Sequence, residues 1–129
     1  MEETVHGKLF LVPTPIGNLS DMTPRALEIL AAVDVVACED TRTSGTLLSK
    51  FGMKKRLVSY HDFNERSRAG QLLETLQSGQ SVAVVTDAGS PGISDPAYRV
   101  VRLALENGIE IIPLPGATAL IPALTGSGL

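Results

Sequence analysis

The sequence has little of what several common kinds of protein require. It contains one cysteine, Cys38, and two histidines in 129 residues. A single cysteine excludes an internal disulfide framework and suits a reducing cytosol. His6 and His61 are too few, and too far from Cys38 in the sequence, to suggest a zinc site. We therefore expect a cytoplasmic protein without a metal site.

Long apolar runs and a strong basic charge are missing as well. No apolar run is long enough to span a bilayer, and the acidic start, Met1-Glu2-Glu3, is not followed by a hydrophobic signal segment. The sequence thus predicts neither membrane insertion nor secretion. The formal net charge of −3 at pH 7 gives no overall indication of nucleic-acid binding, although it leaves room for a local basic patch.

Three familiar active-site motifs are also absent. No G-x-x-x-x-G-K-[ST] is present, which argues against a P-loop nucleotidase. Pro13 and Pro15 stand where a dinucleotide-binding loop would have its first glycines, so an ordinary dinucleotide-binding domain is not expected. Ser90 lacks the G-x-S-x-G setting of a nucleophile elbow.

What the sequence does contain is a regular alternation of strand and helix patterns. The 43% of hydrophobic residues is enough for the core of one domain. Helix patterns separate five short apolar segments, expected as strands over residues 9–12, 33–38, 57–60, 82–85 and 109–112. This order predicts an α/β fold with a five-stranded, mainly parallel sheet flanked by helices on both faces.

Local signals fix several helix boundaries. Thr23 followed by Pro24 predicts a capped helix start, and Asn64 is expected to cap the third helix in the same way. Residues 39–44 are expected to leave the second strand as a loop. Cys38, inside a predicted strand, is expected in the core.

One long loop, residues 86–96, organises the predicted fold. It joins a buried strand to a helix, and a plain turn at such a place needs far fewer residues. Gly89 and Gly92 let a backbone approach a ligand closely, and Asp87 and Asp95 bracket the loop. Open α/β sheets bind ligands at the carboxyl ends of their strands, where this loop begins.

The charged residues near that edge suggest where an anion could bind. Arg42, Arg66, Arg68 and Arg99 lie on or just beyond strand-to-helix loops, so they are better candidates for phosphate contacts than the basic run 54–56. That run lies on a helix-to-strand connection at the opposite edge, and we interpret it as a solvated turn.

The loops together resemble a known family. The chain is similar throughout to the amino-terminal domain of the tetrapyrrole methylase superfamily, and within it to the branch that methylates ribosomal RNA. The similarity is carried by four motifs, Leu11-Val12-Pro13-Thr14-Pro15-Ile16-Gly17-Asn18-Leu19, Glu39-Asp40-Thr41-Arg42, Asp87-Ala88-Gly89-Ser90-Pro91-Gly92-Ile93-Ser94-Asp95-Pro96 and Leu114-Pro115-Gly116-Ala117-Thr118-Ala119.

The resemblance implies an S-adenosylmethionine-dependent enzyme that methylates the ribose 2′-oxygen of a cytidine in 16S ribosomal RNA. Two alternatives remain open, a methylase of a small substrate such as a precorrin and a non-catalytic nucleotide-binding or dimerisation module. Corrin and porphyrin members usually carry Gly-Asp-Pro where this chain has Gly89-Ser90-Pro91, and a glycine-rich first loop where it has Pro13-Thr14-Pro15. Both departures favour the RNA branch.

The resemblance also implies a second domain and a set of partners. Family members carry a further α/β domain, with the cofactor in the cleft between the two. Residues 1–129 are then expected to be the amino-terminal domain, with the carboxy-terminal domain absent from this chain and the isolated chain inactive. Small-subunit ribosomal RNA is the expected substrate. We expect a homo-oligomer, formed through the apolar stretch of residues 119–124.

Methyl transfer to a ribose hydroxyl needs a base that takes the proton, and Asp40, Asp87 and His61 are the local candidates. Arg42 is a candidate substrate contact. Matching the family motifs position by position assigns to S-adenosylmethionine the residues Ile16, Ala88, Gly89, Ser90, Ile93, Thr118 and Ala119.

Overall fold

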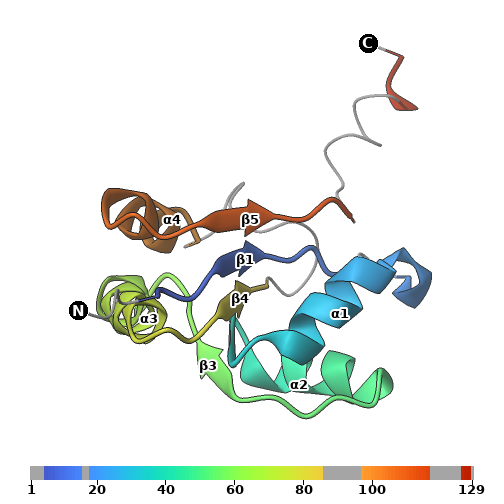
Figure 1. Cartoon of the computed structure of the whole chain (residues 1–129). Helices are drawn as coiled ribbons and strands as arrows, with labels where there is room; N and C mark the ends of the chain where they lie inside the picture. Colours follow the sequence, from blue (N-terminus) through green and yellow to red (C-terminus); the bar gives the residue numbers. More distant parts are fainter. Residues whose placement is uncertain (1–4, 16–17, 86–96, 117–125, 129) are drawn as a thin grey trace.

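The computed structural model describes residues 5–15, 18–85, 97–116 and 126–128. Within these ranges the chain forms five strands in one sheet, every pair parallel, in the order β3-β2-β4-β1-β5 (Figure 1). The predicted five-stranded sheet is thus confirmed, and it is parallel throughout. The strands are β1 (Leu9–Leu11), β2 (Val35–Cys38), β3 (Leu57–Ser59), β4 (Val82–Val84) and β5 (Ile111–Pro113).

Four α-helices and one short 3₁₀ helix connect the strands. In chain order they are η1 (Leu19–Asp21), α1 (Pro24–Ala32), α2 (Thr41–Lys50), α3 (Glu65–Gln77) and α4 (Ala97–Glu106). The sequence analysis did not predict η1. Among the described residues, no helix combines the length and the apolar character needed to cross a membrane.

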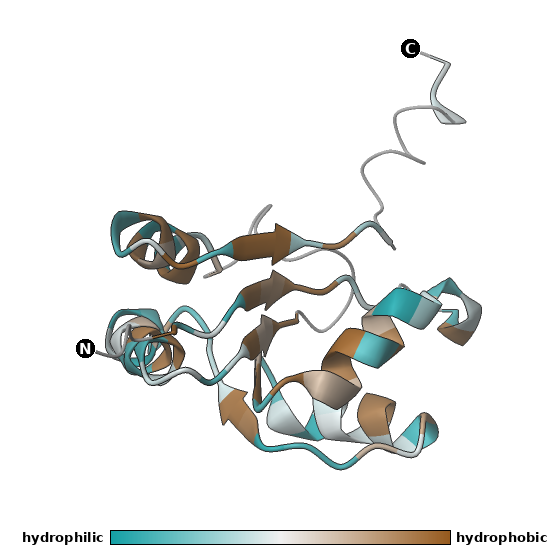
Figure 2. Cartoon of the chain, in the orientation of Figure 1, coloured by the Kyte–Doolittle hydropathy of each residue, from teal (hydrophilic) through white to brown (hydrophobic). Residues whose placement is uncertain are grey.

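The helices cover both faces of the sheet, as predicted. Helices α1 and α2 pack on one face through residues such as Leu30 and Leu48, and α3 and α4 pack on the other through residues such as Leu72 and Val100. Neighbouring strand residues point to opposite faces, so each strand serves both cores. Figure 2 shows the strands and the sheet-facing sides of the helices as hydrophobic.

Strand β2 shows how this alternation works. Val35 and Ala37 belong to the core under α3 and α4, whereas Val36 and Cys38 belong to the core under α1 and α2. All four are buried, as expected for a central parallel strand with a continuous apolar sequence. The prediction that Cys38 is a core residue is confirmed, since it is only 1% exposed.

The order of the strands explains why the helices divide into two pairs. The chain moves outward across the sheet from β1 to β2 to β3 through α1 and α2, and it returns through α3 and α4 to β4 and β5. Parallel crossovers of one hand that run in opposite directions must lie on opposite faces. The connection after the central strand β4 therefore leaves to one face, and those after its neighbours β1 and β2 leave to the other.

Candidate functional site

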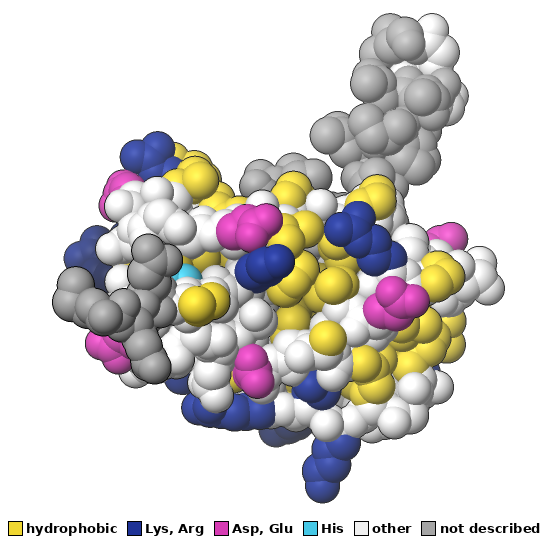
Figure 3. All heavy atoms as spheres, viewed as in Figure 1, with side chains coloured by type: hydrophobic (Ala, Val, Ile, Leu, Met, Phe, Trp, Pro, Cys, Tyr) yellow, Lys and Arg dark blue, Asp and Glu magenta, His cyan; other side chains and the backbone are white. Residues whose placement is uncertain are grey.

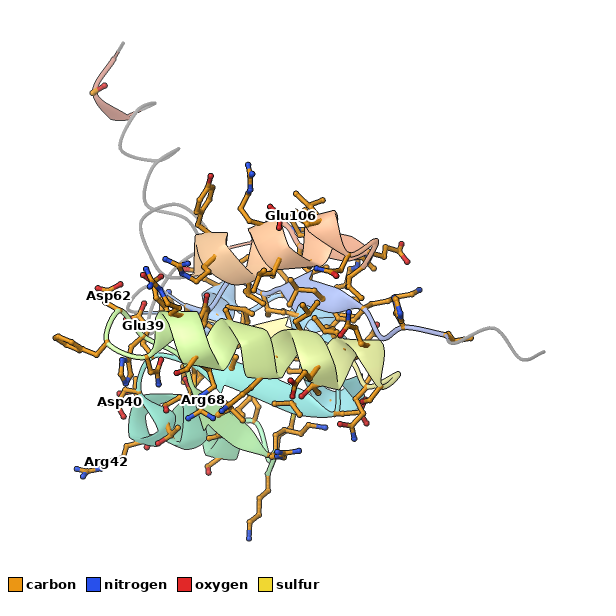
Figure 4. The ribbon with its side chains drawn as sticks, turned by 90° about the vertical axis from the view of Figure 1, so that its left-hand side faces the viewer. Glu39, Asp40, Arg42, Asp62, Arg68 and Glu106 are labelled. Carbon is orange, nitrogen blue, oxygen red and sulfur yellow. The ribbon has the colours of Figure 1, made fainter. Side chains whose placement is uncertain are left out.

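The carboxyl ends of the five strands form one edge of the sheet, which we call the carboxyl edge. Figure 4 shows Glu39 and Asp40, which follow β2, at the same end of the molecule as Asp62, which follows β3. The ends of β1, β4 and β5 also lie side by side, because Leu11 pairs in register with both Val84 and Pro113. Loops far apart in the sequence are thus brought together at this edge.

Two of these loops touch. The main-chain N–H of Leu114 donates to the carbonyl of Leu11 at 3.0 Å. Further on, a Cβ placed on Gly116 would lie 3.0 Å from Cβ of Pro13. The loops after β5 and β1 therefore pack tightly where the first and fourth family motifs meet.

Asp40 begins helix α2. Its Oδ1 accepts the main-chain N–H of Arg42 at 2.8 Å and that of Thr43 at 3.4 Å, which is the usual role of an aspartate at a helix N-cap. The helix therefore begins at Thr41, and the prediction that residues 39–44 form a loop is wrong beyond Asp40. The cap places Arg42 and Thr43 in the first turn, and Figure 4 shows Arg42 pointing outward.

A pocket of about 520 Å³ opens between α2 and the loop after β1. The loop contributes Pro15, Asn18 and Leu19, and the helix contributes Arg42, Thr43, Thr46, Leu47 and Lys50. Among the described residues that line it, two side chains are cationic and none is a carboxylate. This composition favours an anionic ligand.

Sequence reasoning found only one member of this pocket, Arg42. The residues it missed had a readable signal, because Thr43, Thr46, Leu47 and Lys50 are spaced as one face of a helix. The signal was hidden by the assumption that α2 begins after Ser44. Asn18 is held in place at the other wall, where its Oδ1 accepts the N–H of Ser20 at 2.9 Å and caps η1.

A second hollow, of about 540 Å³, lies on the other side of α2 and includes Lys54 and Lys55. Nζ of Lys55 donates to the carbonyl of Ala31 at the end of α1, at 3.1 Å. Part of the basic run that we interpreted as a solvated turn thus ties α1 to the α2–β3 connection. Figure 3 shows cationic and acidic side chains interspersed on one face of the molecule.

The loop after β3 is closed by its own side chains. Oδ1 of Asn64 accepts the N–H of His61 at 2.8 Å, and Nδ2 of Asn64 donates to the carbonyl and the hydroxyl of Ser59, both at 3.2 Å. Asn64 stands at the N-cap position of α3, but its side chain makes no capping hydrogen bond there. The expectation that it caps α3 with its side chain is therefore wrong, because the side chain closes the preceding loop instead.

His61, one of the candidate bases, is engaged in the same loop. Its Nδ1 accepts the main-chain N–H of Phe63 at 3.2 Å. An imidazole that accepts at Nδ1 carries its proton on Nε2 when it is neutral. In that form Nε2 of His61 is a hydrogen-bond donor and cannot take up a proton.

Tyr60 connects this loop to helix α4. It follows β3, is only 1% exposed, and its hydroxyl accepts the main-chain N–H of Val100 at 3.2 Å. This bond joins the residue after β3 to the first turn of α4. No local pattern in the sequence indicates this contact, because Tyr60 has the features of an ordinary strand residue.

The remaining candidates can be placed only in part. Ile16, Asp87, Ala88, Gly89, Ser90, Ile93, Thr118 and Ala119 lie outside the described residues, as does the apolar stretch 119–124. Of the other arginines, Arg99 has its Nε 3.9 Å from Oε2 of Glu65. Nη1 of Arg68 donates to Oε1 of Gln71 at 2.9 Å. The described residues contain no group of three or more His, Cys, Asp or Glu that could hold a metal ion.

Comparison with known proteins gives a consistent set of matches. A family model described as Tetrapyrrole (Corrin/Porphyrin) Methylases matches residues 8–129. Curated proteins named ribosomal RNA small subunit methyltransferase I are 55% identical to the chain in Escherichia coli O157:H7 and 57% identical in Synechocystis, over 123 residues in each case. These alignments cover 95% of the chain but only 43% and 44% of the relatives. The chain thus spans less than half the length of these relatives.

Solved structures show the same fold. A uroporphyrin-III-C-methyltransferase from Thermus thermophilus superimposes with a TM-score of 0.70 at 25% identity, over 95% of this chain and 53% of that one. A cobalt precorrin-4 methyltransferase gives a TM-score of 0.69 at 22% identity, over 99% of this chain and 53% of that one. The predicted fold class is thereby confirmed.

Proposed function

The chain belongs to the tetrapyrrole (corrin/porphyrin) methylase family, and we propose that it forms the amino-terminal part of an enzyme that methylates 16S ribosomal RNA. The reaction would transfer a methyl group from S-adenosylmethionine to the ribose 2′-oxygen of a cytidine. The observation that carries the proposal is the identity of 55% over 123 residues to a ribosomal RNA small subunit methyltransferase I. The solved methylases named for uroporphyrin and precorrin substrates are only 25% and 22% identical, which makes the small-substrate alternative weaker.

The carboxyl edge fits the proposed cofactor. The connections after β1 and β4 leave neighbouring strands to opposite faces, which opens the kind of crevice where α/β sheets bind ligands. The strand ends below it are buried and apolar, with Val12 at 0% and Val85 at 4% exposure. When bound, S-adenosylmethionine supplies an electrophilic methyl group.

We propose that residues from three of the loops at this edge hold the cofactor, its adenine and ribose against Ile16 and Ile93 and its polar groups against the backbone of Ala88 and Gly89. The rest of the proposed set is Ser90, Thr118 and Ala119. The loops bearing these residues follow β1, β4 and β5, the three strands whose ends are in register. The register supports the proposal because it brings the starts of those loops together.

The pocket beside α2 suits the substrate better than the cofactor. The sulfonium of S-adenosylmethionine is positive, and a site with Arg42, Lys50 and no carboxylate would repel it. A phosphate of the RNA backbone has the charge this lining favours, and an arginine guanidinium can bind it with two hydrogen bonds. We propose that Arg42 binds such a phosphate and thereby positions the RNA for transfer.

Removing the proton from the ribose hydroxyl requires a base in line with the transferred methyl group. We propose Asp87, because it follows the central strand β4 by three residues. Of the other two candidates, Asp40 uses Oδ1 to cap α2, and His61 uses Nδ1 to accept the N–H of Phe63.

We propose that the complete protein has a second, carboxy-terminal domain that forms the other wall of the cofactor cleft. The length of the relatives supports this, because the chain spans only 43% of the Escherichia coli protein. A ribosomal substrate would place the reaction in the cytoplasm.

The test uses the complete gene product and small ribosomal subunits from cells that lack the modification. Tritium from labelled S-adenosylmethionine should enter the subunit RNA and, after alkaline hydrolysis, remain in a resistant dinucleotide, because a 2′-O-methyl group blocks cleavage. Replacing Arg42 with Gln should raise KM for the subunits while leaving the affinity for S-adenosylmethionine unchanged. Label found only in an added porphyrin, or in no product, would contradict the proposal.

A further inference from the structure

Two aromatic side chains are exposed at the carboxyl edge, and the function proposed above does not use them. Phe63 is 98% exposed and Tyr98 is 63% exposed. The chain has three Phe, two Tyr and no Trp, and the other three aromatic residues, Phe10, Phe51 and Tyr60, are half-buried or buried. Single exposed apolar side chains are common on protein surfaces, but a nearly fully exposed phenylalanine at this edge is available to contact a ligand.

Both residues stand where neighbouring helices begin. Phe63 lies two residues before α3, and Tyr98 is the second residue of α4. Helices α3 and α4 contribute to one hydrophobic core on the same face of the sheet. Since each follows a parallel strand, both begin at the carboxyl edge, and their aromatic side chains lie at the edge where we place the RNA.

The loop that carries Phe63 holds the residue in a fixed position. The N–H of Phe63 donates to Nδ1 of His61 at 3.2 Å, and the two rings meet edge to face with centroids 6.0 Å apart. Asn64 closes the loop on both sides, through the N–H of His61 and through Ser59. A ring held outward in this way has little conformational freedom to lose when it binds a ligand.

We propose that Phe63, with Tyr98 at the same edge of the sheet, is a surface on which unpaired bases of the RNA substrate stack. The inference rests on the proposed function, because it takes RNA as the substrate. Single-stranded RNA is recognised largely by stacking of splayed bases on Phe, Tyr, Trp or His side chains. His61 adds an aromatic edge next to Phe63, and Arg66, exposed in the first turn of α3, adds a cation for a neighbouring phosphate.

The surroundings of Phe63 fit a base better than a protein partner. Stable protein interfaces bury about 800 Å² on each side around an apolar centre. Phe63 instead stands among Asp62, Asn64, Glu65 and Arg66. One flat ring with polar neighbours matches a single base, which presents an apolar face and a polar rim.

The first experiment compares two substitutions of Phe63 in the complete gene product. Phe63→Leu keeps an apolar side chain but removes the ring, and we expect it to weaken binding of small subunits by about tenfold, within the range for loss of one stacked base. Phe63→Trp should bind within about twofold of the unsubstituted protein, since a larger ring stacks as well. Leu105→Ala is the matched control, because Leu105 is 63% exposed at the opposite end of α4.

The second experiment detects stacking directly. The chain has no tryptophan, so the Phe63→Trp variant introduces a fluorophore at the proposed contact. Adding a single-stranded cytidine oligonucleotide should quench its emission, measured as a difference from the unsubstituted protein, whereas Leu105→Trp should not be quenched. Unquenched emission from Phe63→Trp would overturn the proposal.

Other results would overturn it as well. Unimpaired subunit binding by Phe63→Leu would show that the ring is not required, and loss of binding only in Phe63→Ala would assign the residue to an apolar contact with protein. Both failures are distinct from failure of the proposed function. If the proposed function were wrong, the unsubstituted protein itself would leave the subunit RNA unlabelled.

Discussion

The two edges of the sheet differ in how the backbone is held and in which side chains are exposed. At the amino edge, where the strands begin, the backbone is closely tied: the N–H of Lys8 donates to Oγ of Ser81 at 3.1 Å, and the N–H of Ser81 donates to Oδ2 of Asp34 at 2.8 Å. The connections there are short, and glycines with positive φ, such as Gly79 and Gly108, turn the chain.

The carboxyl edge has the opposite character. Its helix starts are capped by side chains such as Thr23 and Asp40, and it exposes Arg42 and Phe63 to solvent. Among the described residues, the amino edge is held by backbone hydrogen bonds, whereas the carboxyl edge exposes the side chains to which we assign ligand contacts. Substitutions at the two edges should therefore separate stability from activity.

The largest effect is expected from Gly7→Ala at the amino edge. A Cβ at Gly7 would overlap the main-chain carbonyl of Gln80, and the N–H of Gly7 donates to the carbonyl of Leu76 at 2.8 Å. The backbone must shift to relieve the overlap, which should lower the free energy of unfolding by about 3 kcal/mol. Urea denaturation measures the loss.

Gly70→Ala is the matched control for this substitution. Gly70 lies inside α3, and a Cβ there would meet no atom within 4 Å. Replacing a helical glycine with alanine should stabilise the protein by about 0.5 to 1 kcal/mol. The pair should change stability in opposite directions, and a Gly7→Ala variant as stable as the parent would contradict the close approach.

Tyr60→Phe comes next, because Tyr60 links the core to the carboxyl edge. The substitution leaves the ring in place but removes the acceptor of the Val100 N–H. Loss of this buried hydrogen bond should cost about 1 kcal/mol of stability. Since α4 directly follows the proposed cofactor loop, calorimetry on the complete gene product should also show weaker binding of S-adenosylmethionine.

Tyr98→Phe serves as the control, because Tyr98 is 63% exposed and the variant keeps its ring. We expect its stability to change by less than about 0.5 kcal/mol. If the two tyrosine variants unfolded at the same urea concentration, the hydroxyl of Tyr60 would have no role in holding the start of α4.

The sequence was sufficient to predict the fold and the capped start of α1. Alternating apolar segments identified all five strands, and the start of α1 at Thr23-Pro24 is confirmed by the bond from the Ala26 N–H to Oγ1 of Thr23, at 3.0 Å. These features depend on neighbouring residues, and a local pattern records them.

Contacts between distant residues were not predictable in this way. The hydroxyl of Tyr60 meets Val100 across 40 positions of sequence, and Asn18 and Lys50 line one pocket only because the loop after β1 lies near α2 in the fold. Asn64 was misjudged for a related reason. Its side chain had two possible partners, the helix start and the preceding loop, and propensity alone does not choose between them.

Asp40 is expected to show a smaller effect, and its two simplest substitutions separate two roles. Asp40→Ala removes the cap of α2 and should cost about 1 kcal/mol, as should Thr23→Ala at the start of α1. Asp40→Asn keeps a good capping side chain but cannot act as a base. Because we assign the base to Asp87, we expect Asp40→Asn to retain both stability and methyl transfer.

The measurements are urea denaturation and single-turnover methylation of small subunits by the complete gene product. A fall in rate of about 100-fold or more in Asp40→Asn, with stability unchanged, would be the size expected from loss of a general base. That result would assign the role of general base to Asp40 instead of Asp87.

The smallest effect should come from a charge pair at the amino edge. Nζ of Lys8 lies 3.7 Å from Oε2 of Glu110, with the two side chains 53% and 62% exposed. Exposed pairs gain little Coulomb energy in water and lose side-chain entropy, so Glu110→Gln should change the free energy of unfolding by less than about 0.5 kcal/mol. Urea denaturation at low salt and in about 1 M NaCl checks this, since screening should reduce even that small difference. The backbone bonds of Gly7 and Ser81 stay in place in this variant. A loss above about 1 kcal/mol would show that surface charge, rather than backbone closure, holds the amino edge together.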